Sequence, residues 1–118
     1  MQRVRVEYAD HYEAFRKILP RCGCVVRHLR EVSDDRLWTL ISLDEPFEWQ
    51  RKVGEPFKFR LLKIDHFLVA PRRSGTEIGE SEPAPVFISL VEECRVPSGE
   101  SFAIRDYPKI AWGVCHTL

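Results

Sequence analysis

Apolar and polar residues alternate along several short stretches of this chain, and turn-forming residues interrupt them about every eight to twelve positions. The stretches RVRVEY at 3–8 and VFISLVEE at 86–93 are the simplest examples. Side chains of a strand point alternately to its two faces, so this pattern predicts strands with one buried face. The spacing of the turns favours a sandwich or a barrel over alternating strand–helix units.

One stretch has a helical period instead, namely DHYEAFRKIL at 10–19. Its apolar residues fall on a single helical face. Asp10 is placed to cap the first turn, and Glu13 three residues later completes a capping box. Pro20 then ends the predicted helix, because proline does not continue it.

Polar turn formers also indicate a hairpin. The turn sequence Ser33-Asp34-Asp35 separates the apolar runs 24–32 and 36–43, as expected for two antiparallel strands. The remaining segments are a loop or short strand at 46–56, a Gly/Pro-rich loop at 73–85, and two short strands at 101–107 and 109–115.

The stretch FKFRLLKIDHFLVAP at 57–71 contains a shift in the alternation. Its apolar residues are odd-numbered up to Leu61, even-numbered at Leu62 and Ile64, and odd-numbered again from Phe67. A straight strand keeps its phase, so the shift indicates a bulge, a turn, or burial on both faces. Since one straight strand here would be about 50 Å long, we predict a sharp bend or tight turn at 63–66.

These elements predict one globular domain over residues 1–118. We expect a β-rich α+β fold, in which about seven to eight strands form a small bent antiparallel sheet or a partly open barrel. The single N-terminal helix at about 10–19 would pack on one side of it or cover one end.

Composition limits the classes of function. The chain carries 18 basic and 18 acidic residues, whereas binding of nucleic acid normally requires a basic excess, so nucleic acid is a disfavoured partner. No apolar signal segment begins the chain, and its longest apolar run, at 67–70, is too short to cross a membrane. We therefore expect a cytoplasmic protein without membrane contact, in which the four cysteines are reduced.

The charges are segregated along the chain. Consecutive blocks at 1–30, 31–56, 57–73, 74–100 and 101–118 carry net charges of +4, −4, +4, −5 and +1. If neighbouring strands pair these blocks, opposite charges cancel across the sheet. If the basic blocks instead converge on one face, the domain is dipolar and suited to attracting a charged partner.

The cysteines give no clear metal or catalytic motif. Cys22 and Cys24 could supply two soft ligands, but a second pair at zinc-binding spacing is missing, so we predict neither a metal nor another cofactor. Cys115 and His116 are neighbours in a predicted strand and should face opposite sides, which disfavours a catalytic dyad. A dyad of Cys94 or Cys24 with His66 would require a tertiary contact that the sequence does not reveal.

One set of polar and aromatic side chains remains as a candidate ligand site. Asp65 and His66 lie at the predicted bend, and we favour a structural role for them over a catalytic one. The full set, expected at or near the mouth of the barrel, is Asp65, His66, Arg72, Arg73, Trp112 and His116. No residue is assigned a catalytic role.

Three functions are therefore open. The first is a non-enzymatic module that binds a protein partner or a second copy of itself through a charged or aromatic face. The second is a small-molecule or anion binder, or an enzyme, with a pocket at the barrel mouth. The third is a nucleic-acid-binding module that uses Arg3, Arg5, Lys58, Arg60 and Lys63.

Overall fold

The computed structural model describes residues 2–8, 16–33, 36–53, 58–72, 83–107 and 109–118. This described part of the chain forms seven strands and one 3-10 turn. In chain order, the elements are β1 (Arg3–Tyr8), β2 (Arg21–Glu31), β3 (Leu37–Val53), β4 (Lys58–Pro71), β5 (Ala84–Glu92), β6 (Ser101–Phe102), η1 (Ile104–Asp106) and β7 (Lys109–Thr117).

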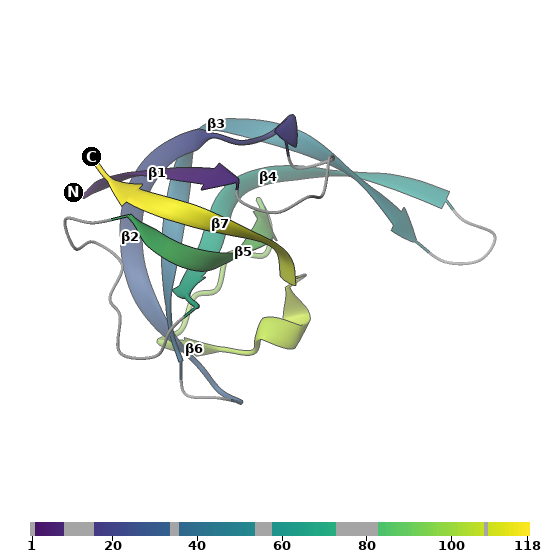
Figure 1. Ribbon diagram of the computed structural model, residues 1–118. Coiled ribbons are helices and arrows are strands. Elements are labelled where there is room, and N and C mark those ends of the chain that lie inside the picture. The colour runs from purple at the N-terminus through teal and green to yellow at the C-terminus, as the bar shows by residue number, and fades with distance from the viewer. Residues whose placement is uncertain (1, 9–15, 34–35, 54–57, 73–82, 108) are drawn as a thin grey trace.

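Six of these strands form a closed antiparallel barrel (Figure 1). From β1 to β5 each strand pairs with the next, β5 pairs with β7, and β7 returns to β1. The extra strand β6 lies outside the barrel and pairs in parallel with the end of β2. The predicted strand-dominated, barrel-like fold is confirmed, and the barrel is closed rather than partly open.

The α+β assignment is not supported. Residues 10–15 of the predicted helix lie outside the described residues, and 16–19 form no complete helix. Across the described ranges the only helical element is the turn η1, so the fold is all-β there. No helix in this part is long and apolar enough to cross a membrane. The predicted strand at 101–107 is also wrong beyond Phe102, because η1 follows directly.

The predicted hairpin is confirmed. β2 and β3 are antiparallel, with Arg30 opposite Leu37 beside the turn. Glu31 is buried, and its carboxylate accepts hydrogen bonds from the backbone N–H of Ser33 at 2.8 and 3.0 Å. A carboxylate without water must find such donors, so the buried Glu31 fixes the course of the chain into the turn.

Two hydrophobic cores lie on the two sides of the barrel wall. The larger fills the barrel interior, and its main members are Val4, Val6, Ile41, Leu43, Leu62, Ile64, Phe67, Val69, Val86, Ile88, Leu90 and Cys115. The smaller lies on the outer face of β2 to β5 and comprises Leu29, Trp38, Leu40, Leu68, Ala70, Val91 and Phe102. The connection from β5 to β7, which carries β6 and η1, covers this outer core.

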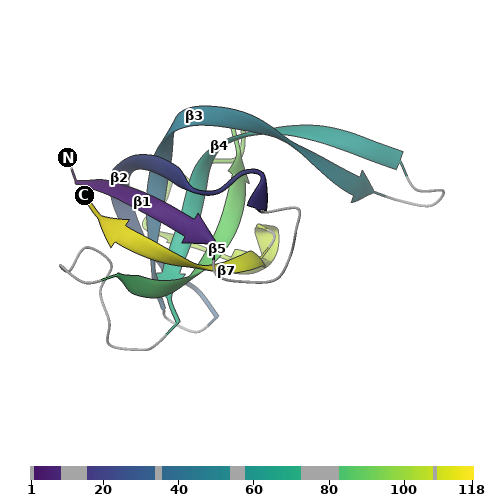
Figure 2. The same ribbon diagram turned by 45° about the horizontal axis from the view of Figure 1, so that its top comes forward.

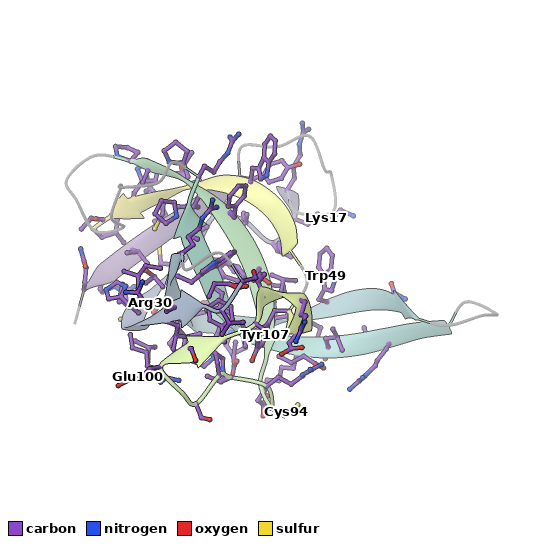
Figure 3. The ribbon with its side chains drawn as sticks, turned by 90° about the horizontal axis from the view of Figure 1, so that it is seen from below. Lys17, Arg30, Trp49, Cys94, Glu100 and Tyr107 are labelled. Atoms are coloured by element: carbon purple, nitrogen blue, oxygen red, sulfur yellow. The ribbon has the colours of Figure 1, made fainter. Side chains whose placement is uncertain are left out.

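Polar contacts hold that connection in place. The guanidinium group of Arg27 donates to the carbonyl oxygens of Pro97, Ser98 and Gly99. Further along, the hydroxyl group of Tyr107 donates to the Arg95 carbonyl at 2.6 Å. Figure 3 shows Tyr107 and Glu100 on this connection, with Arg30 of β2 close to Glu100, whose carbonyl accepts the Arg30 N–H at 3.0 Å.

The predicted turn at 63–66 is a bulge within one strand. β4 is continuous from Lys58 to Pro71, but its pairing with β5 shifts between Ile64 and His66. The extra residue, Asp65, changes which side chains face the barrel interior. After the bulge, Phe67 lies in the interior core and Leu68 in the outer core, so this part of β4 is buried on both faces. Of the three readings of the phase shift, the bulge and the burial on both faces are therefore confirmed, whereas a tight turn at 63–66 is wrong because the strand continues.

Residues 46–53 of the predicted loop or short strand at 46–56 belong to the long strand β3, and residues 54–56 lie outside the described residues. β3 continues to Val53 and pairs with β4 from Phe47↔Ile64 to Val53↔Lys58. Both strands leave the barrel and project as a two-stranded ribbon, seen in Figures 1 and 2. Phe47 and Trp49 at its base pack against the interior core.

Candidate functional site

Two of the predicted site residues, Arg72 and Trp112, meet on the outer face of the barrel. Ala111, Gly113 and Cys115 of β7 point inward, so the alternation turns Trp112 outward, where its side chain is 44% exposed. Arg72 directly follows β4, and its N–H donates to the Pro85 carbonyl at 3.0 Å. The Arg72 guanidinium carbon lies 4.0 Å from the centroid of the Trp112 ring.

Two further residues extend this contact across the sheet. Phe87 of β5 is directly opposite Trp112 in register, and the two ring centroids are 6.4 Å apart. Arg36, just before β3, holds its guanidinium carbon 5.3 Å from the Phe87 centroid. We name the four residues Arg36, Phe87, Trp112 and Arg72 the Arg–aromatic surface. Guanidinium groups over aromatic rings are attracted by about 0.5–1 kcal/mol when exposed.

The Asp65–His66 pair lies elsewhere, at the bulge of β4. Nδ1 of His66 is 2.7 Å from Oδ1 of Asp65, and both side chains are half-buried. Adjacent residues in a strand normally face opposite sides, and the bulge relaxes this rule. The pair thus makes a local contact at the bulge, and the structural role that we favoured stays a prediction.

A polar row on the outer face runs through His66. Pairing places Ser42 opposite His66, Cys24 opposite Ser42, and Arg3 opposite Cys24. The row thus crosses four neighbouring strands, β4, β3, β2 and β1. Cys24 and His66 are two strand spacings apart, roughly 10 Å, so they do not form a dyad.

At one end of this row, the Arg3 side chain contacts other side chains of the same chain. Its guanidinium group forms a two-pronged ion pair with the Asp44 carboxylate and also lies 3.3 Å from Sγ of Cys24. The hydrogen bond from Arg3 holds the pKa of the Asp44 carboxyl below its usual range. Both charges are satisfied by each other, which is typical of a stabilising contact at a barrel rim.

His116 occupies a third place. Its Nε2 lies 2.9 Å from Oε2 of Glu7 on β1, and Glu7 also contacts Arg5 at 3.0 Å. Cys115 beside it points into the interior core, as the alternation predicted, so the two residues form no dyad. Of the six predicted site residues, Arg73 lies outside the described residues, and Arg72 and Trp112 meet. Asp65 contacts His66, and His116 contacts Glu7, at two other places.

The cysteine environments give a prediction for thiol reactivity. Burial raises the pKa of the Cys115 thiol to about 11, whereas Cys94 is exposed. At about pH 8, Cys115 should therefore stay protonated and resist alkylation, while Cys94 is labelled readily. Mass spectrometry after a pulse of iodoacetamide measures both, and labelling in denaturant is the control. Labelling of native Cys115 at the rate of Cys94 would contradict the buried position.

A surface hollow of about 350 Å³ lies away from the predicted site residues that the structure describes. It is lined by Lys17, Ile18, Leu19, Pro20, Arg21, Cys22, Asp44 and Glu45. Arg21 is committed to internal contacts, because it donates to the Glu45 carbonyl at 2.8 Å and stacks 4.3 Å above the Phe47 ring. Across the described ranges, no three potential metal ligands gather in one place.

Comparisons with known proteins do not add to this picture. Neither a protein-family model, nor a curated protein, nor a solved structure matches the chain. The function must therefore be inferred from the side chains themselves.

Sequence reasoning missed half of the Arg–aromatic surface. Phe87 and Arg36 were not selected, although VFISL alternates and therefore turns Phe87 outward if Val86 and Ile88 point inward. Arg36 carried no local signal, because it reaches Phe87 only once β3, β4 and β5 lie side by side. Tertiary pairing of the strands, rather than any motif, creates this surface.

Proposed function

We propose that this domain is a protein-interaction module that binds an acidic segment of a partner protein through the Arg–aromatic surface. The observation that carries the proposal is the exposed indole of Trp112 with the guanidinium group of Arg72 stacked on it. This is the first of the three functions that the sequence left open.

Residue types support this choice. Tryptophan and arginine are enriched among the residues that dominate binding energy at protein interfaces. The ring contact holds the guanidinium group of Arg72 in place, so less side-chain entropy is lost when it meets a carboxylate. Among the described residues, Arg72 contacts the ring of Trp112 and forms no ion pair with a carboxylate. Acidic segments are the chemical complement of a guanidinium group.

The same geometry argues against the other functions at this surface. Bases of single-stranded nucleic acid need an open aromatic face for stacking, whereas Arg72 already covers a face of Trp112. An enzyme needs a nucleophile and a base within hydrogen-bonding reach, and the described polar groups form separate pairs instead.

The test is a titration of a fluorescently labelled poly-glutamate peptide, followed by anisotropy at low and high salt. Wild-type protein should bind at low salt, and Trp112→Ala or Arg72→Gln should weaken binding at least about tenfold. Arg105→Gln is the matched control, since Arg105 is an exposed arginine on η1 that is not part of the Arg–aromatic surface, and it should change affinity less than about twofold.

Folding and self-association are checked in the same samples. Trp112→Ala should lower the free energy of unfolding by about 1–2 kcal/mol, because it removes the contacts of the indole with Arg72 and Phe87, and the protein should remain folded. Light scattering reports whether the surface binds a second copy instead of the peptide. Absence of peptide binding at low salt, or equal affinity of wild type and Trp112→Ala, would overturn the proposal.

A further inference from the structure

An apolar pair of residues lies next to the two aromatic rings of the Arg–aromatic surface. Register places Pro85 of β5 opposite Val114 of β7, two residues along each strand from the pair Phe87↔Trp112. The residue between them on each strand is buried, so the alternation turns all four side chains to the outer face. Pro85 is exposed and Val114 is half-buried. The apolar part of this face therefore extends beyond the aromatic rings.

A positive charge lies at the Trp112 end of this apolar strip. The guanidinium carbon of Arg72 is 4.0 Å from the centroid of the Trp112 ring. The backbone of Arg72 is anchored beside the strip, because its N–H donates to the Pro85 carbonyl at 3.0 Å. A carboxylate that binds this guanidinium group is therefore brought close to the apolar pair Pro85↔Val114.

The other end of the strip has the opposite charge. Register places Glu7 of β1 opposite Val114. The Glu7 carboxylate lies 2.9 Å from Nε2 of His116 and 3.0 Å from Nε of Arg5. Since this end already contains a carboxylate with its own partners, a second acidic group has no vacant cation to meet there. The Val114 end is thus suited to an apolar side chain.

The distance between the two ends defines a spacing. Trp112 and Val114 are two residues apart on one strand, which corresponds to about 6.8 Å. Side chains two positions apart in any extended segment have the same separation and point to the same side. An extended segment that lies along β7 can therefore place one side chain at Arg72 and the next one on that side at Val114.

We propose that the partner segment is extended and carries an acidic residue and an apolar residue two positions apart. The acidic residue meets the guanidinium group of Arg72, and the apolar residue packs on Pro85 and Val114. This inference rests on the proposed function of the Arg–aromatic surface and makes its partner more specific. A run of acidic residues alone leaves the apolar pair uncovered, so it binds less tightly than a segment that also buries an apolar side chain.

The test compares short peptides whose ends are acetylated and amidated, so that one glutamate carries the only charge. The matching peptide is Gly-Ser-Leu-Ser-Glu-Ser-Leu-Ser-Gly, in which leucine lies two positions from glutamate in both directions. The control Gly-Ser-Ser-Leu-Glu-Leu-Ser-Ser-Gly has the same composition with a spacing of one. Titration of ¹⁵N-labelled protein, followed at the indole signal of Trp112, measures each affinity. The matching peptide should bind at least about fivefold more tightly than the control peptide.

Two further peptides separate the charged contact from the apolar one. Replacing the glutamate of the matching peptide by glutamine should weaken binding at least about fivefold, because the contact with Arg72 is lost. Replacing both leucines by serine should weaken binding to a similar extent, because the apolar pair is left uncovered.

Val114→Thr tests the apolar end from the side of the protein. Threonine keeps a branched side chain in the strand but adds a hydroxyl group, so the preference for the matching peptide should fall below about twofold. Affinity for poly-glutamate should stay within about twofold of wild type. Val26→Thr is the matched control, because Val26 is a valine on β2 that is 47% exposed, and it should keep the full preference. Circular dichroism checks that both variants are folded.

The outcomes distinguish this inference from the proposed function. If poly-glutamate binds and depends on Trp112, but the two leucine spacings bind equally, the spacing is wrong and the proposed function stands. A preference that survives in Val114→Thr would also overturn the spacing alone. If neither poly-glutamate nor any of the peptides shifts the Trp112 signal, both proposals fail. Equal binding of the glutamine and glutamate peptides would remove the role of the acidic residue, and with it both proposals.

Discussion

Gly113→Ala should lower the free energy of unfolding by about 3 kcal/mol, because the new methyl group has no space inside the barrel. A Cβ atom at Gly113 would overlap the carbonyl oxygen of Glu7 and lie 2.5 Å from Cδ1 of Ile88. Gly113 lies on β7 between β1 and β5, so the atoms that would have to move belong to both neighbouring strands. Closing six strands into a barrel requires such close approach at some positions.

Thermal unfolding followed by circular dichroism measures this effect. The expected loss corresponds to a melting temperature lower by roughly 10 °C. Gly99→Ala is the matched control, because a Cβ atom there would meet only the backbone oxygen and nitrogen of Ser101, at 3.6 and 3.9 Å, which are ordinary contacts. Equal melting temperatures for the two variants would contradict the packing of β7 against its neighbours.

The second large effect concerns β4, which is buried on both faces after its bulge. Phe67→Ala should cost about 3–5 kcal/mol from the interior core, and Leu68→Ala about 2–5 kcal/mol from the outer core. Consecutive residues of an ordinary half-buried strand would not both be sensitive, because one of them faces solvent.

Leu61→Ala provides the comparison on the same strand. Leu61 is 64% exposed on the ribbon, so its replacement should change the free energy of unfolding by less than about 0.5 kcal/mol. Denaturant titrations of the three variants measure the differences. A small effect for Leu68→Ala would mean that the β5–β7 connection does not cover the outer core.

Alternation predicted much of this fold because it is a local property. The strands at 3–8 and 86–93 and the hairpin around residue 33 need only a period of two and a turn signal, and all three are present. The shift near Asp65 was equally visible. Whether it ends the strand depends on partners, since β3 and β5 continue to pair with β4 on both sides of the bulge.

Other features depend on contacts that no local pattern encodes. The outer core forms because Phe102 and Tyr107 return to the outer face of the barrel, where Phe102 packs edge-on against Trp38 at 5.9 Å. Closure of the barrel likewise depends on the pairing of β1 with both β2 and β7, from opposite ends of the chain. Long-range pairing of this kind decided between an open and a closed barrel.

The candidate site was predicted only in part for the same reason. Arg72 and Trp112 were selected as polar and aromatic residues near strand ends. They meet because Arg72 follows β4, Trp112 belongs to β7, and only β5 lies between these two strands. Asp65, His66 and His116 were selected by the same reasoning, yet strand order places them in other pairs. Residue type identified the candidate residues, but the order of the strands decides which of them lie next to each other.

The segregated charges also have a partial explanation. Glu92 and Glu93 come from an acidic block of the sequence, and they contact Arg60 and Lys63 from a basic block on the ribbon of β3 and β4. Opposite charges of neighbouring blocks therefore cancel at this place, which is one of the two arrangements considered from the sequence.

The three tryptophan side chains allow the most direct test of the Arg–aromatic surface. Trp38 lies in the outer core, Trp49 at the base of the ribbon, and Trp112 beneath Arg72. In a ¹⁵N–¹H spectrum, titration with poly-glutamate should shift the indole signal of Trp112 and leave those of Trp38 and Trp49 unchanged. An unchanged Trp112 signal at saturating peptide, or a larger shift at Trp38 or Trp49, would contradict binding at this surface.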